Sequence, residues 1–373
     1  MTPWLQELFF RVFPPMLFDG QPGYPILVRS VGAFIVAFFC VFLMGRRTAA
    51  WLYRRGVRDR VRDYDEFFGR SKSGTPTMGG LLIVLAITAA ALVFNDLRSP
   101  VASLLLLAAL WFGGLGAVDD FLKVRHQSSD LGLSRSLKML LQAGFAVVVA
   151  AFVCVDGLSP FSEATRTALF LPLPGLFGTD RIDLGLLYPV LCVFAIVAIA
   201  NAINFADGLD GLAVLPCALT TAVFGFFAYL AWNTVTARAF QLVPLEGMQE
   251  VAVFSSAVVG ACFGFLWFNG YPAQMIMGDT GSQALGGSLG VIAVLSKQEL
   301  LFLIAGGVFV FEAFSVLFQD YVGIRWIGRR FFFRAPAHHA FQYRGVAETK
   351  VVLRFWIVSL LCAVLSVATL KLR

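Results

Sequence analysis

The stretch LLYPVLCVFAIVAIANAINFADGLDG, residues 186–211, contains the two features from which the fold follows. Its first fifteen residues carry no charge, and it closes on asparagines and aspartates that include Asn204, Asp207 and Asp210. An apolar run of about 18 residues is long enough to cross the hydrocarbon core of a bilayer as a helix. The stretch therefore predicts a transmembrane helix that ends in a polar, glycine-containing turn.

The rest of the chain repeats this pattern. Hydrophobic residues occupy 58% of the 373 positions, charged residues only 14%, and the mean hydropathy is +0.79. This balance is typical of an integral membrane protein and not of a soluble domain. The sequence therefore predicts an all-α polytopic membrane protein with about ten transmembrane helices. The predicted spans are 24–44, 77–94, 101–118, 138–155, 186–203, 212–232, 251–268, 283–296, 300–319 and 351–370. The glycine-rich span 283–296 is the shortest, and without it the two termini would lie on opposite sides.

The distribution of lysine and arginine predicts the orientation. The loops on one side of the ten spans carry 18 Lys and Arg residues, and the loops and termini on the other side carry 8. Because basic residues concentrate on the cytoplasmic side, the first side is predicted to be cytoplasmic and both termini to lie outside. We expect a single domain over residues 1–373, with segment 1–23 at the membrane interface. Residues 156–185 form an outer loop with room for a short hairpin, and residues 320–350 form a cytoplasmic loop with an interfacial helix.

Two classes of protein are disfavoured. The formal charge of +6 does not indicate a nucleic-acid partner, because basic residues of a membrane protein mark its topology and meet lipid headgroups. A secondary transporter would place its coupling acids near the bilayer midplane. Here only Glu312 lies deep in a predicted span, where we expect it to be structural, and either buried and paired with another helix or protonated. The six cysteines lie in apolar runs without a Cys-x-x-Cys spacing, which predicts buried thiols.

Polar residues gather where the predicted spans meet the cytoplasmic side. They are Asp119-Asp120 after the third span, Asn204, Asp207 and Asp210 after the fifth, Asn269 after the seventh, Asp279 and Ser282 before the eighth, and His338-His339 in the last inner loop. Any one of these acids could be a helix cap, but their shared position predicts a site. Carboxylates without nearby thiolates suit Mg²⁺, which takes one or two carboxylates together with phosphate oxygens. The backbone N–H groups near Asp279, between two glycines, could also hold an anion at the start of a helix.

Two further elements could reach a phosphate. Lys72 precedes the second span and would act as a point charge, or else it snorkels to the interface. His338 and His339 could donate hydrogen bonds to phosphate or, less readily, bind a metal; the alternative is an exposed loop pair.

At this point the motifs are specific enough to identify a resemblance. The chain resembles the phospho-N-acetylmuramoyl-pentapeptide transferase family, within the polyprenyl-phosphate N-acetylhexosamine-1-phosphate transferase superfamily. The matching strings, in order from residue 71 onward, are SKSGTPTMGG, GAVDDFLKV, NAINFADGLDGLA, FNGYPAQMIMGDTGSQALGG, RAPAHHAFQ and RFWIVSL. Residues 1–70 match only loosely.

The resemblance implies a bacterial inner-membrane enzyme with its active site facing the cytoplasm. Such an enzyme transfers phospho-MurNAc-pentapeptide from UDP-MurNAc-pentapeptide to undecaprenyl phosphate with Mg²⁺, giving lipid I and UMP; the resemblance is also compatible with a homodimer. By motif position, Asp119 and Asp120 lie at the polyprenyl phosphate, with Asp119 as its base, and Asp279 binds Mg²⁺. His338 is grouped with these three as catalytic. The residues implied to surround the nucleotide sugar are Lys72, Thr77, Asn204, Asp207, Asp210, Asn269, Ser282, Gln319 and His339.

Two positions depart from the family pattern. Ala340 stands where members usually carry a third consecutive histidine, and Ile276 stands where an aromatic residue is common, which leaves uracil stacking there in doubt. An alternative is a sister enzyme that transfers GlcNAc-1-phosphate from UDP-GlcNAc to the same lipid. The Ala-Pro-x-His-His loop and the Arg-Phe-Trp string near the C-terminus argue against that alternative.

Overall fold

The computed structural model describes residues 24–58, 74–128, 131–331 and 334–371. Lys72 and the predicted interfacial segment 1–23 lie outside these ranges. The long helices are α2 (Tyr24–Arg54), α3 (Gly80–Phe94), α4 (Pro100–His126), α5 (Arg135–Cys154), α8 (Tyr188–Ala206), α9 (Val214–Ala231), α11 (Met248–Asn269), α12 (Gly278–Leu295), α14 (Gly307–Leu317) and α16 (Glu348–Ala368). Short helices are α6 (Glu163–Arg166), α7 (Pro174–Phe177), α10 (Thr234–Ala239), α13 (Phe302–Ala305) and α15 (Ala337–Tyr343). The prediction of an all-α membrane protein is confirmed.

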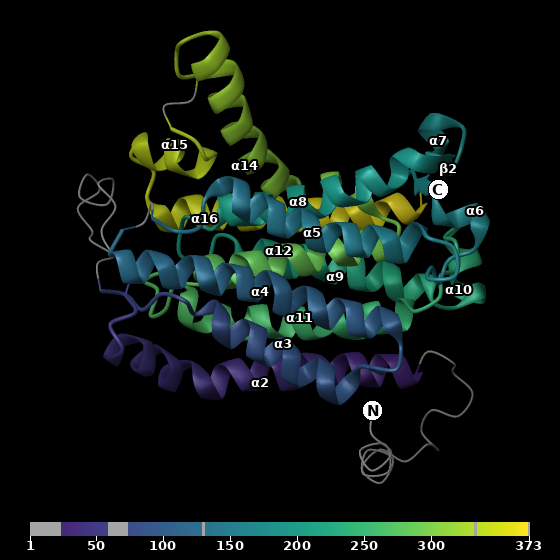
Figure 1. The fold of residues 1–373 in the computed structure, drawn as a ribbon, viewed down its shortest axis with the longest axis horizontal. Helices are drawn as coiled ribbons and strands as arrows, with labels where there is room; N and C mark the ends of the chain where they lie inside the picture. Colours follow the sequence, from purple (N-terminus) through teal and green to yellow (C-terminus); the bar gives the residue numbers. More distant parts are fainter. Residues whose placement is uncertain (1–23, 59–73, 129–130, 332–333, 372–373) are drawn as a thin grey trace.

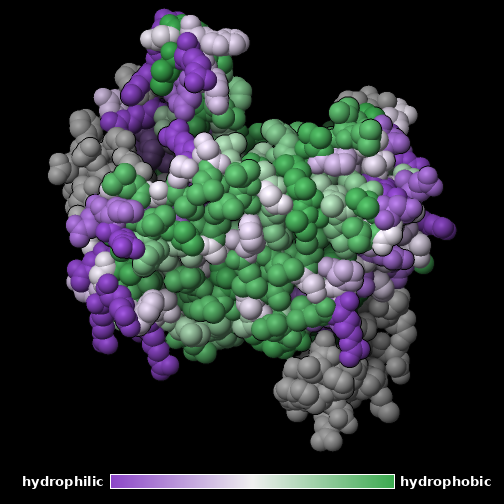
Figure 2. Space-filling model, viewed as in Figure 1, coloured by the Kyte–Doolittle hydropathy of each residue, from purple (hydrophilic) through white to green (hydrophobic). Residues whose placement is uncertain are grey.

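The long helices lie roughly side by side in one bundle (Figure 1). Eight helices of the described residues are long and apolar enough to cross a membrane. The two other predicted spans correspond to α3, which has only 15 residues, and to the glycine-rich α12. Figure 2 shows a broad hydrophobic band across the middle of the bundle, with hydrophilic residues at both ends. The exact number of crossings stays a prediction.

Helix α12 lies at the centre of the bundle. Every residue from Thr280 to Leu295 is buried, and the helix packs mainly on α4 and α8. Small residues permit this close packing at its first turn. A Cβ on Gly80 of α3 would overlap the backbone of Gly281, and a Cβ on Gly116 of α4 would overlap the carbonyl of Asp279. The start of α12 is therefore held tightly between α3 and α4.

One end of the bundle, which we call the hairpin end, carries the predicted outer loop. Strand β1 (Ala168–Phe170) pairs antiparallel with β2 (Arg181–Asp183), so a hairpin does form within residues 156–185. The ammonium of Lys297 anchors this loop, because it donates a 2.7 Å hydrogen bond to the Arg166 carbonyl and lies 3.9 Å from the ring centre of Tyr188. Burial lowers the pKa of Lys297 to about 8.

The predicted span 300–319 is not one helix. It begins as a 3₁₀ turn, Glu299–Leu301, and α13, breaks at Gly306, and resumes as α14. Helix α14 then continues as a π-helical segment, Phe318–Trp326, that projects away from the bundle (Figure 1). The first part of loop 320–350 therefore extends α14, and the separate helix in this loop is α15. Whether either lies on a lipid surface stays a prediction.

The opposite end, which we call the site end, brings together the five segments predicted to share one side. The Val57 carbonyl accepts from Thr77 N at 3.2 Å, and the Pro76 carbonyl accepts from Ile276 N at 2.8 Å. The side-chain oxygen of Asn269 accepts from Gly211 N at 3.0 Å. Segments far apart in the sequence are thus joined by direct hydrogen bonds.

Candidate active site

Two adjacent carboxylates on α4 face different partners. Helix α4 continues to His126, eight residues beyond the predicted end of its span, so Asp119 and Asp120 lie within a regular helix. Both are buried, at 2% and 6% exposure. Asp119 Oδ1 accepts a 2.6 Å hydrogen bond from Leu133 N, in the connection to α5. Asp120 faces the start of α12 instead.

Asp120 binds the N-terminus of α12. Its Oδ1 accepts from Asp279 N at 3.0 Å, and its Oδ2 accepts from Thr280 N at 2.8 Å and from Thr280 Oγ1 at 2.6 Å. A carboxylate is favoured there because the first N–H groups of a helix are unpaired and carry partial positive charge. The expectation that these N–H groups are free to hold an anion is therefore wrong for Asp279 and Thr280, because the protein supplies the anion itself.

Asp279 and Asp119 share two lysines. Lys138 Nζ lies 2.6 Å from Asp279 Oδ2 and 3.4 Å from Asp119 Oδ2, and Lys123 Nζ lies 2.9 Å and 2.8 Å from the same two oxygens. The other oxygen of Asp279 accepts from Asn204 Nδ2 at 3.0 Å. Two carboxylates and two ammonium groups thus form one compact cluster, which we call the carboxylate–lysine cluster.

Asn204 joins this cluster to Ser282, whose Oγ accepts from Asn204 Nδ2 at 2.8 Å. About one helical turn further into the bundle, three amides continue the polar network. Gln142 Nε2 donates to Gln283 Oε1 at 2.7 Å, and Asn201 Nδ2 donates to Gln142 Oε1 at 2.8 Å. These amides tie α5, α8 and α12 together beneath the carboxylates.

A second group of residues surrounds His338 on α15. Its Nδ1 lies 3.2 Å from Glu312 Oε2, and its backbone N donates to Glu312 Oε1 at 3.2 Å. Both side chains are fully buried, so the expectation of a buried, paired Glu312 is confirmed. His338 Nε2 has no hydrogen-bond partner among the described residues and packs against Gly208. Since Gly208 follows Asp207, the imidazole lies against the polar turn that follows α8.

Three further predicted site residues, Asp210, His339 and Gln319, contact different parts of the structure. Asp210 braces the turn, because its Oδ2 accepts from Ala273 N at 3.0 Å. His339 Nδ1 lies 3.1 Å from Gln342 Oε1, and the rings of His338 and His339 are 4.2 Å apart. Gln319 lies on the projecting helix, where its Oε1 accepts from Phe331 N at 3.0 Å.

Sequence reasoning missed the two lysines. Lys123 follows Asp119 by four residues, the spacing that places an acid and a base on one helix face, so this pair could have been found. Lys138 begins the predicted span 138–155, and its contact with Asp279 crosses 141 positions of sequence. Local patterns contain no signal for such a contact.

Comparison with known families assigns this membrane-spanning chain to a class of glycosyl transferases. Residues 102–297 match the family described as glycosyl transferase family 4. Residues 72–84 match phospho-N-acetylmuramoyl-pentapeptide-transferase signature 1.

Relatives extend this match over nearly the whole chain. The phospho-N-acetylmuramoyl-pentapeptide-transferase of Desulfotalea psychrophila is 44% identical over 348 residues, covering 93% of this chain and 94% of the relative. The enzyme of that name from Desulfosudis oleivorans is 40% identical, covering 98% and 96%, and that of Nitratidesulfovibrio vulgaris is 43% identical, covering 93% and 94%. The chain belongs to the phospho-N-acetylmuramoyl-pentapeptide-transferase family, as its motifs predicted.

Proposed function

We propose that this protein transfers phospho-N-acetylmuramoyl-pentapeptide from UDP-MurNAc-pentapeptide to undecaprenyl phosphate, releasing UMP and producing lipid I. Family membership supports the choice of reaction. The observation that carries the proposal is the carboxylate–lysine cluster, which combines two acids and two ammonium groups at the end of a membrane-spanning bundle. A reaction between a soluble phosphate ester and a lipid phosphate needs such a site.

In its simplest form, this reaction is a single displacement at phosphorus. An oxygen of the lipid phosphate attacks the phosphorus that carries the sugar. The bond from that phosphorus to UMP breaks, and UMP leaves with the electron pair. Asp119 takes up the proton when the lipid phosphate arrives protonated. Lys123 and Lys138, now bound to carboxylates, can turn to the phosphate oxygens and offset their negative charge.

The donor set fits Mg²⁺. No group of three or more His, Cys, Asp or Glu side chains arranged to hold a metal occurs in the described part of the chain. Mg²⁺ needs only one or two carboxylates, because waters and substrate phosphates complete its coordination. Asp279 would hold the ion, with Asp119 near enough to assist, since one ammonium lies within 3.0 Å of both. When bound, Mg²⁺ would neutralise charge on the pyrophosphate.

Two residues act through their neighbours in this proposal. Asp120 has both oxygens bonded to the first turn of α12, so we assign it to positioning Asp279, in place of the contact with the polyprenyl phosphate that the family resemblance implies. Glu312 accepts from Nδ1 of His338 and leaves Nε2 available toward the turn at Asp207. We assign His338 and His339 to substrate phosphate or sugar, together with Thr77, Asp207 and Asn269.

We place the site end on the cytoplasmic side of a bacterial inner membrane, supported by the 18 to 8 distribution of basic residues between the two sides. Cysteine accessibility at Asp320, on the projecting helix of the site end, would test this placement. A homodimer is compatible with the family resemblance, and native mass spectrometry of the purified protein would test it.

The proposed reaction is tested with purified protein, undecaprenyl phosphate, Mg²⁺ and each of two donors, UDP-MurNAc-pentapeptide and UDP-GlcNAc. A lipid product from the first donor only is the expected result, and one from UDP-GlcNAc only would establish the sister activity. Asp279→Asn should abolish UMP release, whereas the exposed Asp320→Asn, a matched control at the same end, should not. Retained release in Asp279→Asn would overturn the metal assignment alone.

A further inference from the structure

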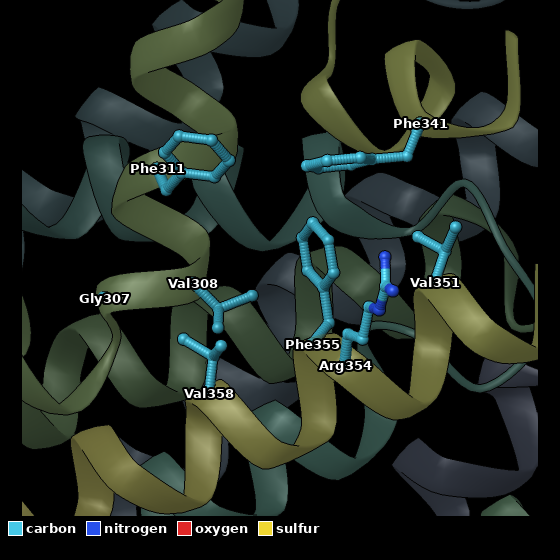
Figure 3. A pocket seen from close by; sticks show the side chains of 8 residues that line it. All are labelled: Gly307, Val308, Phe311, Phe341, Val351, Arg354, Phe355 and Val358. Carbon is cyan, nitrogen blue, oxygen red and sulfur yellow. The ribbon is translucent and has the colours of Figure 1, made fainter. Parts of the chain in front are cut away.

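A cavity lies outside the carboxylate–lysine cluster, between α14, α15 and α16 (Figure 3). It has a volume of about 220 Å³. Its walls are almost entirely apolar and are formed mainly by Val308 and Phe311, Phe341, and Val351, Phe355 and Val358. Phe311 and Val358 are 45% and 48% exposed on helices that are candidate membrane spans. The cavity therefore opens to the side of the bundle that lipid would cover.

Arg354 is the one charged residue in the lining of this cavity. Its side chain is exposed, and it forms no hydrogen bond or ion pair with the described residues. Figure 3 shows its guanidinium directed toward α15, beside Phe355. A guanidinium on a lipid-facing wall needs an anionic partner or water, and phosphate matches its planar donors well.

Arg354 lies at a depth along α16 from which it could contact a lipid headgroup. Helix α16 begins at Glu348, at the site end, and Arg354 follows six residues later, about 9 Å along the axis. A long basic side chain at this depth can reach the phosphate level of a bilayer while its stem stays in hydrocarbon. The apolar part of the cavity then lies at the depth of the acyl chains.

We propose that this cavity holds part of an acyl chain of an anionic phospholipid whose phosphate binds Arg354. The cavity has room for about seven methylene-sized groups, taking each as similar in size to a water molecule, which suits a chain segment and not a headgroup. The lining contains no acid that could bind the cationic headgroup of a zwitterionic lipid. A net negative headgroup is therefore favoured.

The lipid would support the histidines. Phe341 follows His338 by three residues in the same short helix, and its ring packs edge-on against Phe355 at 6.2 Å. An acyl segment in the cavity would pack on the ring of Phe341, which lines it. Lipid occupancy would then hold α15, and with it His338 and His339, against the bundle.

The test is competitive binding followed by native mass spectrometry, with phosphatidylglycerol and phosphatidylcholine of identical acyl chains. This readout needs no enzymatic activity. We expect Arg354→Gln to lower the preference for phosphatidylglycerol about fivefold, since one basic residue near a membrane surface contributes about 1 kcal/mol. Arg344→Gln removes the same charge from an exposed residue outside the cavity and should keep the preference. Equal preference in wild type and Arg354→Gln would overturn the proposal.

Cross-linking locates the acyl chain. Phosphatidylglycerol with a photoactivatable acyl chain should label Phe311, Phe341 or Phe355 in the wild type. Val358→Trp, which fills the cavity, should remove this labelling, and Leu360→Trp, an exposed change elsewhere on α16, should not. Labelling that persists in Val358→Trp would contradict the assignment. Stoichiometric displacement of the phospholipid by undecaprenyl phosphate would assign the cavity to the lipid substrate instead and overturn the proposal.

Discussion

Gly208→Ala perturbs the candidate site through one buried contact. A Cβ at this position would lie 2.8 Å from His338 Cε1 and closer still to Nε2. Carbon atoms pack at about 3.5–4.0 Å, so the imidazole has to withdraw by roughly 1 Å. The ring is fully buried and bound to Glu312, so it cannot move without breaking that pair. Gly208 does not have a positive φ, and alanine therefore adds no backbone strain.

A displacement of this size at a reacting or binding group typically costs about 100-fold in turnover. We expect this loss in kcat for UMP release, with a stability loss of about 1–3 kcal/mol from overpacking. Gly114→Ala is the matched control, because its added Cβ meets no heavy atom within 4 Å. In a double-mutant cycle, adding Gly208→Ala to a protein that already carries His338→Ala should lower turnover only slightly further. Wild-type turnover in Gly208→Ala, or full additivity in the cycle, would refute the assignment of His338.

Three further predictions concern single side chains. Lys138→Gln leaves Asp279 with one ammonium group, so one preorganised positive charge is lost from the site. We expect kcat for UMP release to fall about 100-fold. An unchanged kcat would exclude Lys138 from the reaction. Thr280→Val removes the hydroxyl that is bonded to Asp120 and should lower the free energy of unfolding by about 1–3 kcal/mol. Thermal unfolding measures this loss, and Thr280→Ser should restore the stability. An unchanged midpoint of thermal unfolding in Thr280→Val would argue against the hydrogen bond. The pKa of Lys297 is lowered to about 8 by burial and returns to about 10.4 on unfolding, so unfolding takes up a proton and thermal stability should rise from pH 8 to pH 10. Lys297→Met should flatten this rise, and an equal slope in both proteins would refute it.

The sequence predicted which residues meet because hydropathy and charge assign each loop to one side of a membrane. Asp119, Asn204, Asp279 and Ser282 were grouped by that reasoning, and the structure joins all four in one hydrogen-bonded network. The orientation of each side chain was beyond such reasoning. Asp119 and Asp120 are neighbours on one helix, yet one faces the lysines and the other caps α12, because their directions differ by about 100° around the helix axis.

Contacts between distant segments also explain what was not predicted. The N–H groups of α12 are bound by Asp120, which lies 159 positions from Asp279 in the sequence. The break at Gly306 interrupts a run that is apolar on both sides, so hydropathy predicted one continuous span. Hydropathy identifies where a chain can cross a membrane, and tertiary packing decides where its helices break.

We propose that the carboxylate–lysine cluster transfers a phosphosugar from a UDP carrier to a polyprenyl phosphate. Mass spectrometry of the lipid formed from UDP-MurNAc-pentapeptide and undecaprenyl phosphate tests it most directly, because one mass identifies both donor and acceptor. We predict the mass of undecaprenyl-pyrophosphoryl-MurNAc-pentapeptide, with one UMP per lipid and no product from Asp279→Asn. A lipid product of another mass, or no lipid product from the wild type, would contradict the account.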